Sequence, residues 1–418
     1  MSAAVSRGGE VVWADALGLA DVEAGRETTP DTQYRIGSIT KTFTAAAILQ
    51  LRDAGLLDLD DRLGRHLPDV PHPGPTLRRL LSHLSGLQRE PPGEIWESLR
   101  PPSREELLAS LADAEQILTP GAHWHYSNLG FALLGEVVER VSGTSYRAYV
   151  EERLLRPVGL ARTTFVAEEP SARGYLVDEY SDAARPERDV DLAGTASSGQ
   201  LWSTTGDLLR WGAFLAEPDP SVLAPDSAAQ MRAVQTMMDA ERWQVGWGLG
   251  LALYRRGDAV WAGHGGAMPG QVAALVFRPQ DSVGAAVLTN SGAFPGPDDL
   301  ALALAEKALE LEPRQPEGWR PAGPPPDDVA GLLGAWWSEG YEHVFRWHDG
   351  RLVADLLIAA EHRRRSVFAP EGADRWRVAE GRERGEVLRV VRDEAGVPVK
   401  LYWATYPFTR APQVFGAE

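Results

Sequence analysis

The chain of 418 residues contains no cysteine, and only three of its 42 basic residues are lysines. Without cysteine there are no disulfides, no thiolate metal ligands and no catalytic thiol. No stretch approaches the roughly 18 consecutive apolar residues of a membrane-spanning helix, so we expect no membrane partner. The first residues also lack the apolar segment of a signal peptide. We therefore expect a cytoplasmic protein, unless a leader preceded this sequence.

Negative charge prevails over positive charge in the chain. It carries 59 acidic residues, and its formal net charge is −17. This balance argues against nucleic acid as a partner, because nucleic-acid-binding domains present a basic surface to the phosphates. Hydrophobic content of 44% and charged content of 24% are ordinary for a globular protein. The length allows two domains, or one large and one small domain.

One of the three lysines, Lys41, lies three residues after Ser38 in a segment that ends a strand and begins a helix. Residues three apart share one face of a helix, and serine is a favoured first residue, so we expect the helix to begin at Ser38. A desolvated lysine can lose its proton, whereas arginine cannot. The pair therefore suits nucleophilic catalysis, in which the amine takes the serine proton. The alternative is an exposed helix lysine beside a capping serine.

The order of the expected elements indicates an α/β (α+β) fold. Apolar and β-branched runs predict strands at both ends of residues 1–312, and residues 57–190 between them have a mostly helical pattern. We expect one domain over 1–312, with an antiparallel sheet flanked by helices and a helical subdomain at about 57–190. The strands are expected at 10–14, 33–36, 246–254, 259–262, 271–277 and 282–288, and a last helix at 300–311.

The composition changes after this region. Residues 313–327 are rich in proline and predict a linker. Residues 328–418 contain short strand patterns with a hairpin signal at Asp349-Gly350, so we expect a small all-β domain. Its tryptophans Trp336, Trp337 and Trp347 are expected in its core rather than in a ligand site.

Two further motifs accompany the first one. Tyr126-x-Asn128 lies at a loop-to-helix junction, and His264-x-Gly266 at the expected end of a strand. Together with Ser38-x-x-Lys41, in this order, they resemble the three motifs of the serine β-lactamase and penicillin-binding-protein family. The likeness is greatest to the class C-like branch, which includes esterases, D-amino-acid peptidases and cyclising thioesterases. It covers about residues 5–311, and the all-β unit resembles the lipocalin-like tail of some members.

The resemblance implies a role for each motif residue. Ser38 would be the acylated nucleophile, and Lys41 would share its proton and favour a phenolate at Tyr126. Asn128 would bind the substrate or orient Lys41, and two glycines would let the strand edge approach the ligand. The implied catalytic residues are Ser38, Lys41 and Tyr126; the implied substrate-binding or orienting residues are Asn128, His264, Gly265 and Gly266; and the implied oxyanion hole consists of the backbone N–H groups of Ser38 and Ala267.

The sequence departs from the family pattern at His264, where classical β-lactamases and D,D-peptidases mostly have a lysine that binds a substrate carboxylate. Histidine is mostly neutral at pH 7, and we expect its charge to change between about pH 5.5 and 7.5. The change disfavours penicillin-like substrates and favours an esterase or amidase.

The sequence thus predicts a serine hydrolase that cleaves esters or amides of small-molecule or peptide-like acyl substrates, with no cofactor and no metal. His123 and His125 are two residues apart, so on a strand they would point to the same side and could bind a metal together. No third ligand is visible nearby in the sequence. Three alternatives stay open: acyl transfer, as in a cyclising thioesterase; a β-lactamase or D,D-peptidase; and a non-catalytic sensor on the same fold. The substrate and the oligomeric state are not indicated.

Overall fold

The computed structural model describes residues 1–178, 180–181, 183–313 and 323–414. The chain divides into two compact units, Met1–Arg314 and Gln315–Glu418. Most of the linker expected at 313–327 falls on residues 314–322, outside the described residues. No helix in the described part of the chain is long and apolar enough to span a bilayer.

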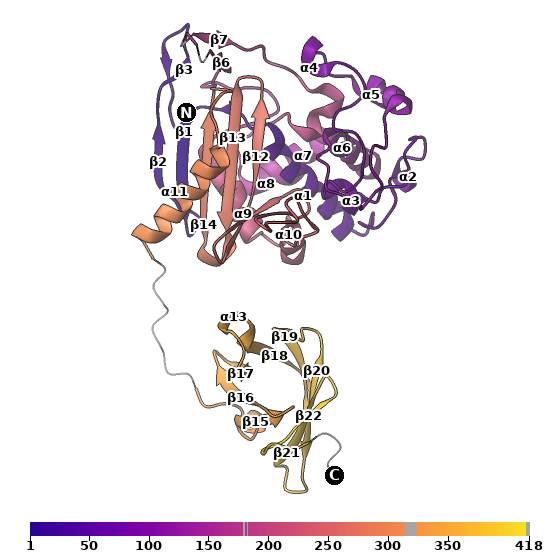
Figure 1. The fold of residues 1–418 in the computed structure, drawn as a ribbon, viewed down its shortest axis with the longest axis vertical. Coiled ribbons are helices and arrows are strands. Elements are labelled where there is room, and N and C mark those ends of the chain that lie inside the picture. Colours follow the sequence, from indigo (N-terminus) through magenta and orange to yellow (C-terminus); the bar gives the residue numbers. More distant parts are fainter. Residues whose placement is uncertain (179, 182, 314–322, 415–418) are drawn as a thin grey trace. The chain divides into compact units, whose positions relative to one another are not determined.

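The first unit is built on an eight-stranded antiparallel sheet with helices on both faces (Figure 1). Alternate residues of β13 supply the two cores: Ala273, Leu275 and Phe277 pack with α1 and α9, whereas Ala274 and Val276 pack with α11. The period of two thus buries both faces of the strand. The strand order is β2 (Glu10–Ala16), β1 (Ser2–Arg7), β14 (Val283–Thr289), β13 (Gln271–Arg278), β12 (Ala259–Met268), β11 (Ala252–Arg256), β10 (Val245–Trp247) and β9 (Thr236–Met237).

Helices fill the middle of the first unit, as the sequence predicts for residues 57–190. The helix after Ser38 is almost completely buried, and Phe43 in it stacks on Trp211 of α9 with ring centroids 4.0 Å apart. The helices of this unit are α1 (Thr40–Asp53), α2 (Leu63–His66), α3 (Leu77–Leu81), α4 (Ile95–Ser98), α5 (Arg104–Ser110), α6 (Asn128–Ser142), α7 (Tyr146–Val150), α8 (Arg156–Val158), α9 (Thr205–Ala216), α10 (Pro225–Met231) and α11 (Pro297–Leu311).

Three sequence expectations on strands need correction. Residues 246–254 form two strands, β10 and β11, because Gly250 adopts a left-handed conformation (φ +72°) in the turn between them. Strand β12 is longer than expected, so His264 lies inside it rather than at its end. The strand expected at 33–36 is reduced to β5 (Tyr34–Arg35), which pairs with β8 (Trp202–Ser203) outside the main sheet. The other short pairs are β3 (Leu19–Asp21) with β4 (Arg26–Glu27), and β6 (Tyr175–Val177) with β7 (Ala184–Pro186).

The second unit is a nearly closed all-β barrel. Its eight strands follow one another in chain order, and Trp337 and Thr409 join the first strand to the last through reciprocal backbone hydrogen bonds of 2.8 and 3.0 Å. Trp336 is fully buried in its core, as expected, whereas Trp337 and Trp347 are half-buried. The elements are α12 (Asp327–Ala330), β15 (Gly334–Ser338), β16 (Tyr341–His348), β17 (Arg351–Leu356), α13 (Glu361–Arg364), β18 (Arg365–Gly372), β19 (Arg375–Glu380), β20 (Val387–Arg392), β21 (Pro398–Trp403) and β22 (Tyr406–Phe408).

Candidate active site

Ser38 lies in a single 3-10 turn, Gly37–Ile39, immediately before α1. The expectation that the helix begins at Ser38 is therefore wrong by two residues: α1 begins at Thr40, and the Ser38 side chain caps nothing. The turn is possible because Gly37 takes a positive φ of 49°. Ser38 is half-buried, so a substrate can reach its hydroxyl, while the helix that follows it is almost completely buried.

Lys41 lies on the first turn of α1 and is completely buried. Its Nζ is 3.0 Å from Ser38 Oγ, 2.7 Å from Asn128 Oδ1 and 2.6 Å from the backbone carbonyl oxygen of Ser198. Burial lowers the pKa of Lys41 well below its usual value, and Arg89 lowers it further while Glu90 opposes the shift. The alternative of an exposed helix lysine beside a capping serine is therefore wrong, because Lys41 is buried and Ser38 caps no helix.

Tyr126 lies just before α6, and its ring centroid is 4.9 Å from Lys41 Nζ. Burial raises the pKa of the Tyr126 phenol, and this outweighs the hydrogen bond with Ser38, which lowers it. The predicted phenolate is therefore wrong for the free protein. The reason is burial, which disfavours the charged phenolate.

Asn128, the first residue of α6, connects Lys41 to a carboxylate that the sequence did not reveal. Its Oδ1 accepts a hydrogen bond from Lys41, and its Nδ2 donates one of 2.6 Å to Glu90 Oε1. Of the two roles left open for Asn128, orienting Lys41 is the one that these contacts support. Glu90 and Arg89 follow the Ser82–Leu87 segment, and nothing in their spacing marks them as neighbours of Lys41.

The second half of β12 runs beside the Ser38 turn. Residues 264–268 pair only with β13, because the pairing with β11 ends at Gly263, so this half has a free edge. A Cβ on Gly266 would lie 1.9 Å from the Ile36 carbonyl oxygen and 3.3 Å from the Ser38 nitrogen, and one on Gly37 would lie 2.7 Å from the Ala267 nitrogen. Because neither glycine has a Cβ, the Ser38 turn and β12 can lie in close contact here. The backbone nitrogens of Ser38 and Ala267 lie beside this contact.

Gly265 faces the opposite side of the sheet. A Cβ at this position would lie 2.9 Å from a carboxylate oxygen of Asp298 in α11. The Asp298 carboxylate also accepts a hydrogen bond of 3.0 Å from Tyr254. The expectation that Gly265 brings the strand close to a ligand is therefore wrong, because its open side is taken up by α11.

His264 lies on the same face as Lys41 and is only 3% exposed. Burial lowers its pKa to about 3, and Lys41 contributes in the same direction. The expected change of charge between about pH 5.5 and 7.5 is therefore wrong, because a desolvated imidazole resists protonation. Its Nδ1 is 2.5 Å from the Gly265 carbonyl oxygen, so that nitrogen carries the proton, and Nε2 is buried without a partner among the described residues.

A cluster of aromatic rings packs against Tyr126 and His264, and the sequence analysis did not predict it. The ring of His83 packs 4.2 Å from Tyr126 and 4.9 Å from Trp247, and its Nδ1 accepts a hydrogen bond from the Ser127 backbone. Trp247 also contacts His264, with ring centroids 5.3 Å apart. These contacts hold the Tyr126 and His264 rings in place. His83 lies outside the three motifs, so the motif analysis did not identify it.

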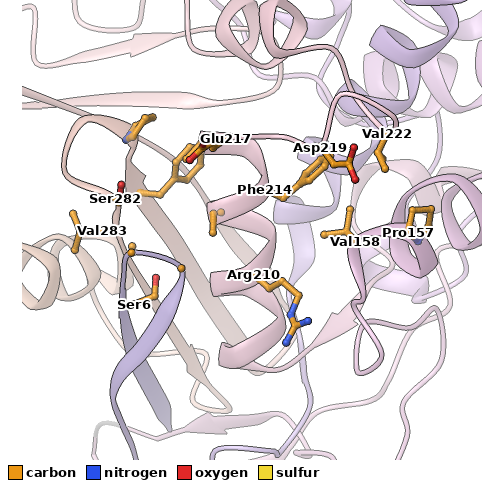
Figure 2. Close-up of a pocket in the computed structure, with 18 residues that line it drawn as sticks. Ser6, Pro157, Val158, Arg210, Phe214, Glu217, Asp219, Val222, Ser282 and Val283 are labelled. Atoms are coloured by element: carbon orange, nitrogen blue, oxygen red, sulfur yellow. The ribbon is translucent and has the colours of Figure 1, made fainter. Parts of the chain in front are cut away.

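One described cavity lies away from Ser38. Figure 2 shows a pocket of about 590 Å³ that is lined by residues of α9, of the β1–β2 hairpin and of the turn before β14, with Arg210, Phe214 and Val283 among them. No residue of any of the three motifs lines it. The pocket has no part in the chemistry considered below.

Comparison with known protein families agrees with this geometry. Residues 1–310 match the β-lactamase family, and residues 325–410 match a domain of unknown function, DUF7586. Penicillin-binding protein 4 of Amycolatopsis lactamdurans is 32% identical over 350 residues, which cover 78% of this chain and 90% of that protein. Esterase EstB of Burkholderia gladioli is 32% identical over 288 residues, which cover 59% of this chain and 73% of that one.

Solved structures show the same relationship. A D-stereospecific amidohydrolase from Streptomyces superposes with a TM-score of 0.62 at 28% identity, covering 73% of this chain and 92% of that one. The octameric penicillin-binding protein homologue from Pyrococcus abyssi superposes with a TM-score of 0.67 at 25% identity, covering 98% and 95%. The chain belongs to the β-lactamase family of serine hydrolases.

Proposed function

We propose that the protein is an esterase or amidase that cleaves small-molecule or peptide-like acyl substrates through an acyl-enzyme on Ser38. The observation that carries the proposal is the environment of the Lys41 amine. A neutral amine has two N–H donors and one lone pair. In the neutral form, the Asn128 and Ser198 carbonyl oxygens, at 2.7 and 2.6 Å, would accept both donors, and the lone pair would accept the Ser38 hydroxyl proton across the 3.0 Å between Nζ and Oγ.

Acylation follows from this arrangement. Lys41 accepts the proton of the Ser38 hydroxyl as Oγ attacks the substrate carbonyl carbon, and the carbonyl oxygen becomes an oxyanion. The backbone N–H groups of Ser38 and Ala267 would stabilise that charge without help from any side chain. Tyr126, which is protonated in the free protein, would pass a proton to the leaving alcohol or amine and regain one from Lys41. Water then releases the acyl group by the reverse relay.

The substrate class follows from the charge of the site. His264 stays neutral at ordinary pH and cannot bind a carboxylate as lysine does. This supports neutral esters and amides over penicillin-like substrates. The cation at the site is Arg89, which is exposed and lies 5.0 Å from the Tyr126 ring centroid. The relatives include an esterase and a D-stereospecific amidohydrolase, whose names correspond to the two bond types proposed here.

The proposal is tested with p-nitrophenyl esters of increasing acyl length and with D-amino acid amides. We expect a burst of one equivalent of p-nitrophenol, and a burst that is absent in Ser38→Ala. Added amines that accelerate release would identify acyl transfer as the main reaction. Turnover of a β-lactam faster than of every ester and amide would contradict the assignment.

The pH dependence offers a further prediction. Because the pKa of His264 is about 3, the residue stays neutral across the range in which an ordinary histidine titrates. The ratio of kcat/KM for a matched anionic and neutral ester is therefore expected to be constant between about pH 5.5 and 7.5. Both values should fall together at low pH, as Lys41 becomes protonated below its lowered pKa. A ratio with a midpoint near 6.5, as for an ordinary histidine, would show that His264 is charged by protonation.

For the second unit we propose a lipocalin-like barrel. The support is its eight-stranded meander in chain order, closed by the Trp337–Thr409 hydrogen bonds, since lipocalins are closed barrels of eight strands. We also propose, as the sequence predicts, that residues 1–312 and 328–418 are separate domains.

Truncation tests this division. Every residue placed at the site lies in the first unit, and the core clusters of the two units share no residue. A chain ending at Pro313 is therefore expected to fold and to react at Ser38 with a fluorophosphonate at a rate similar to the full chain. The measurement is the labelling rate, together with the thermal unfolding of the shortened chain. A folded but unreactive truncation would show that the barrel supplies part of the site.

A further inference from the structure

The barrel of the second unit is closed at one end and open at the other. Near the start of β15, Val329 and Leu332 are 1% and 0% exposed and belong to the barrel core. They fill the closed end. At the other end lie the connections β15–β16, β17–β18, β19–β20 and β21–β22, because consecutive strands are antiparallel. A cavity of about 290 Å³ lies at this end, and each of these four connections contributes residues to its lining.

Two buried polar groups line this cavity without a partner. Ser338 and Trp403 are the last residues of β15 and β21, and they are 6% and 5% exposed. Alternation places them on the inward face, two residues after the core residues Trp336 and Leu401. Within the described part of the chain, neither Ser338 Oγ nor Trp403 Nε1 has a hydrogen-bond partner. A buried donor left unpaired is costly, so a ligand acceptor at this place would relieve the cost.

The rim of the cavity carries positive charge. Three arginines, Arg363, Arg364 and Arg382, line the cavity at this end together with two glutamates, Glu339 and Glu383, and Glu383 forms an ion pair of 3.0 Å with Arg382. No carboxylate among the described residues lies within ion-pair distance of Arg363 or Arg364, whose side chains are exposed. The two guanidinium groups are therefore available to an anion.

The wall below the rim is mostly apolar, with His343 and Ser366 as polar members. Ala354 and Leu356 contribute to it from β17 and Phe408 from β22, whereas Ile358 lies in the turn after β17 and is 65% exposed. The ring of Phe408 packs 5.7 Å from that of Trp403. A ligand that enters from the rim thus meets positive charge first, then two hydrogen-bond donors, and then aliphatic and aromatic surface.

We propose that this cavity binds a small amphipathic carboxylate. The carboxylate oxygens accept hydrogen bonds from Ser338 Oγ and Trp403 Nε1 and pair with Arg363 and Arg364, while the apolar body lies between Leu356 and Phe408. An eight-stranded barrel has an interior of the size that holds one small ligand. The site is independent of the Ser38 chemistry, and the proposal holds whichever acyl substrate the hydrolase uses.

The test uses the full chain with Ser38 blocked by a fluorophosphonate, so that the hydrolase site neither turns over nor retains the probe. Octanoate is titrated by calorimetry and by tryptophan fluorescence, and octanamide and acetate are titrated as matched probes. We expect one saturable octanoate site per chain, with octanamide binding at least about tenfold more weakly because a charge-assisted contact is lost. Acetate, which lacks the apolar body, is expected not to bind measurably.

Variants locate the site. The double substitution Arg363→Gln/Arg364→Gln, on exposed side chains that leave the fold intact, is expected to lower octanoate affinity about tenfold and to leave octanamide unchanged. Ser338→Ala should weaken both probes. Arg389→Gln, on an exposed and outward-facing arginine of β20, is the matched control and should change neither. The absence of saturable octanoate binding, equal binding of octanamide, or insensitivity to the double substitution would each overturn the proposal.

Discussion

Replacing Lys41 by arginine is expected to lower kcat/KM for a neutral ester by about 10²- to 10⁴-fold, which is the usual contribution of a general base. Arginine keeps the positive charge but does not release its proton in proteins. The proposed mechanism requires a neutral Lys41, because the amine must accept the proton of the Ser38 hydroxyl 3.0 Å away, and burial lowers the pKa of Lys41 in that direction. The measurement is kcat/KM and the burst rate with a p-nitrophenyl ester.

Two further variants distinguish a role of the Lys41 charge from a role of Lys41 in proton transfer. Lys41→Ala should be about as inactive as Lys41→Arg, because both lack a base beside Ser38. Lys307→Arg is the matched control, since Lys307 is exposed and forms an ion pair with Glu310. It should leave activity and thermal stability unchanged. If Lys41→Arg kept most of the activity in a normally folded protein, Lys41 would act as a fixed charge and the proposed proton relay would be wrong.

Gly266→Ala is expected to lower kcat by about 10²- to 10³-fold, as the loss of an oxyanion-hole donor does. The added Cβ would lie 1.9 Å from the Ile36 carbonyl oxygen, which is a backbone atom and cannot rotate away. The strand and the Ser38 turn must therefore separate, and the backbone nitrogens of Ser38 and Ala267 separate with them. The measurement is kcat and KM separately. We expect kcat to fall and KM to change little, because the oxyanion hole stabilises the transition state.

Gly265→Ala is the neighbouring control. Its Cβ would approach the Asp298 side chain on the opposite face of the sheet, at 2.9 Å. We expect a lower melting temperature with kcat changed far less than in Gly266→Ala. Equal losses of kcat in the two variants would show that the strand tolerates no Cβ at either position, and that the effect does not come from the Ser38 turn.

The layers of the fold could be predicted from the sequence because they depend on periodicity. Residues 272–277 and 283–288 are continuous apolar runs with valine in each, as strands buried on both faces are. Strand β1 was missed, since its six residues Ser2–Arg7 are small or polar and carry weak strand propensity. It is a strand because β14 and β2 pair with it on both sides, and that partnership is not visible locally.

The site could be predicted only as far as its motifs extend. Ser38, Lys41, Asn128 and His264 stand in short patterns, and the fold brings them together. The Ser198 carbonyl that accepts a hydrogen bond from Lys41 has no signature, because any residue supplies a backbone oxygen. The charge states were mispredicted for Tyr126 and His264 for one physical reason: both pKa values are set by burial, which depends on what packs around the ring.

The central claim is that Ser38 is the nucleophile and that a neutral Lys41 activates it. The most direct test is intact-mass and peptide mapping of the full chain after reaction with a fluorophosphonate, with the labelling rate followed across pH. We expect one label per chain, on Ser38, at a rate that rises with pH through a midpoint well below the usual lysine value and is lost in Lys41→Ala. A label on another serine while Ser38 stays unmodified, or a rate that does not depend on Lys41, would contradict the account.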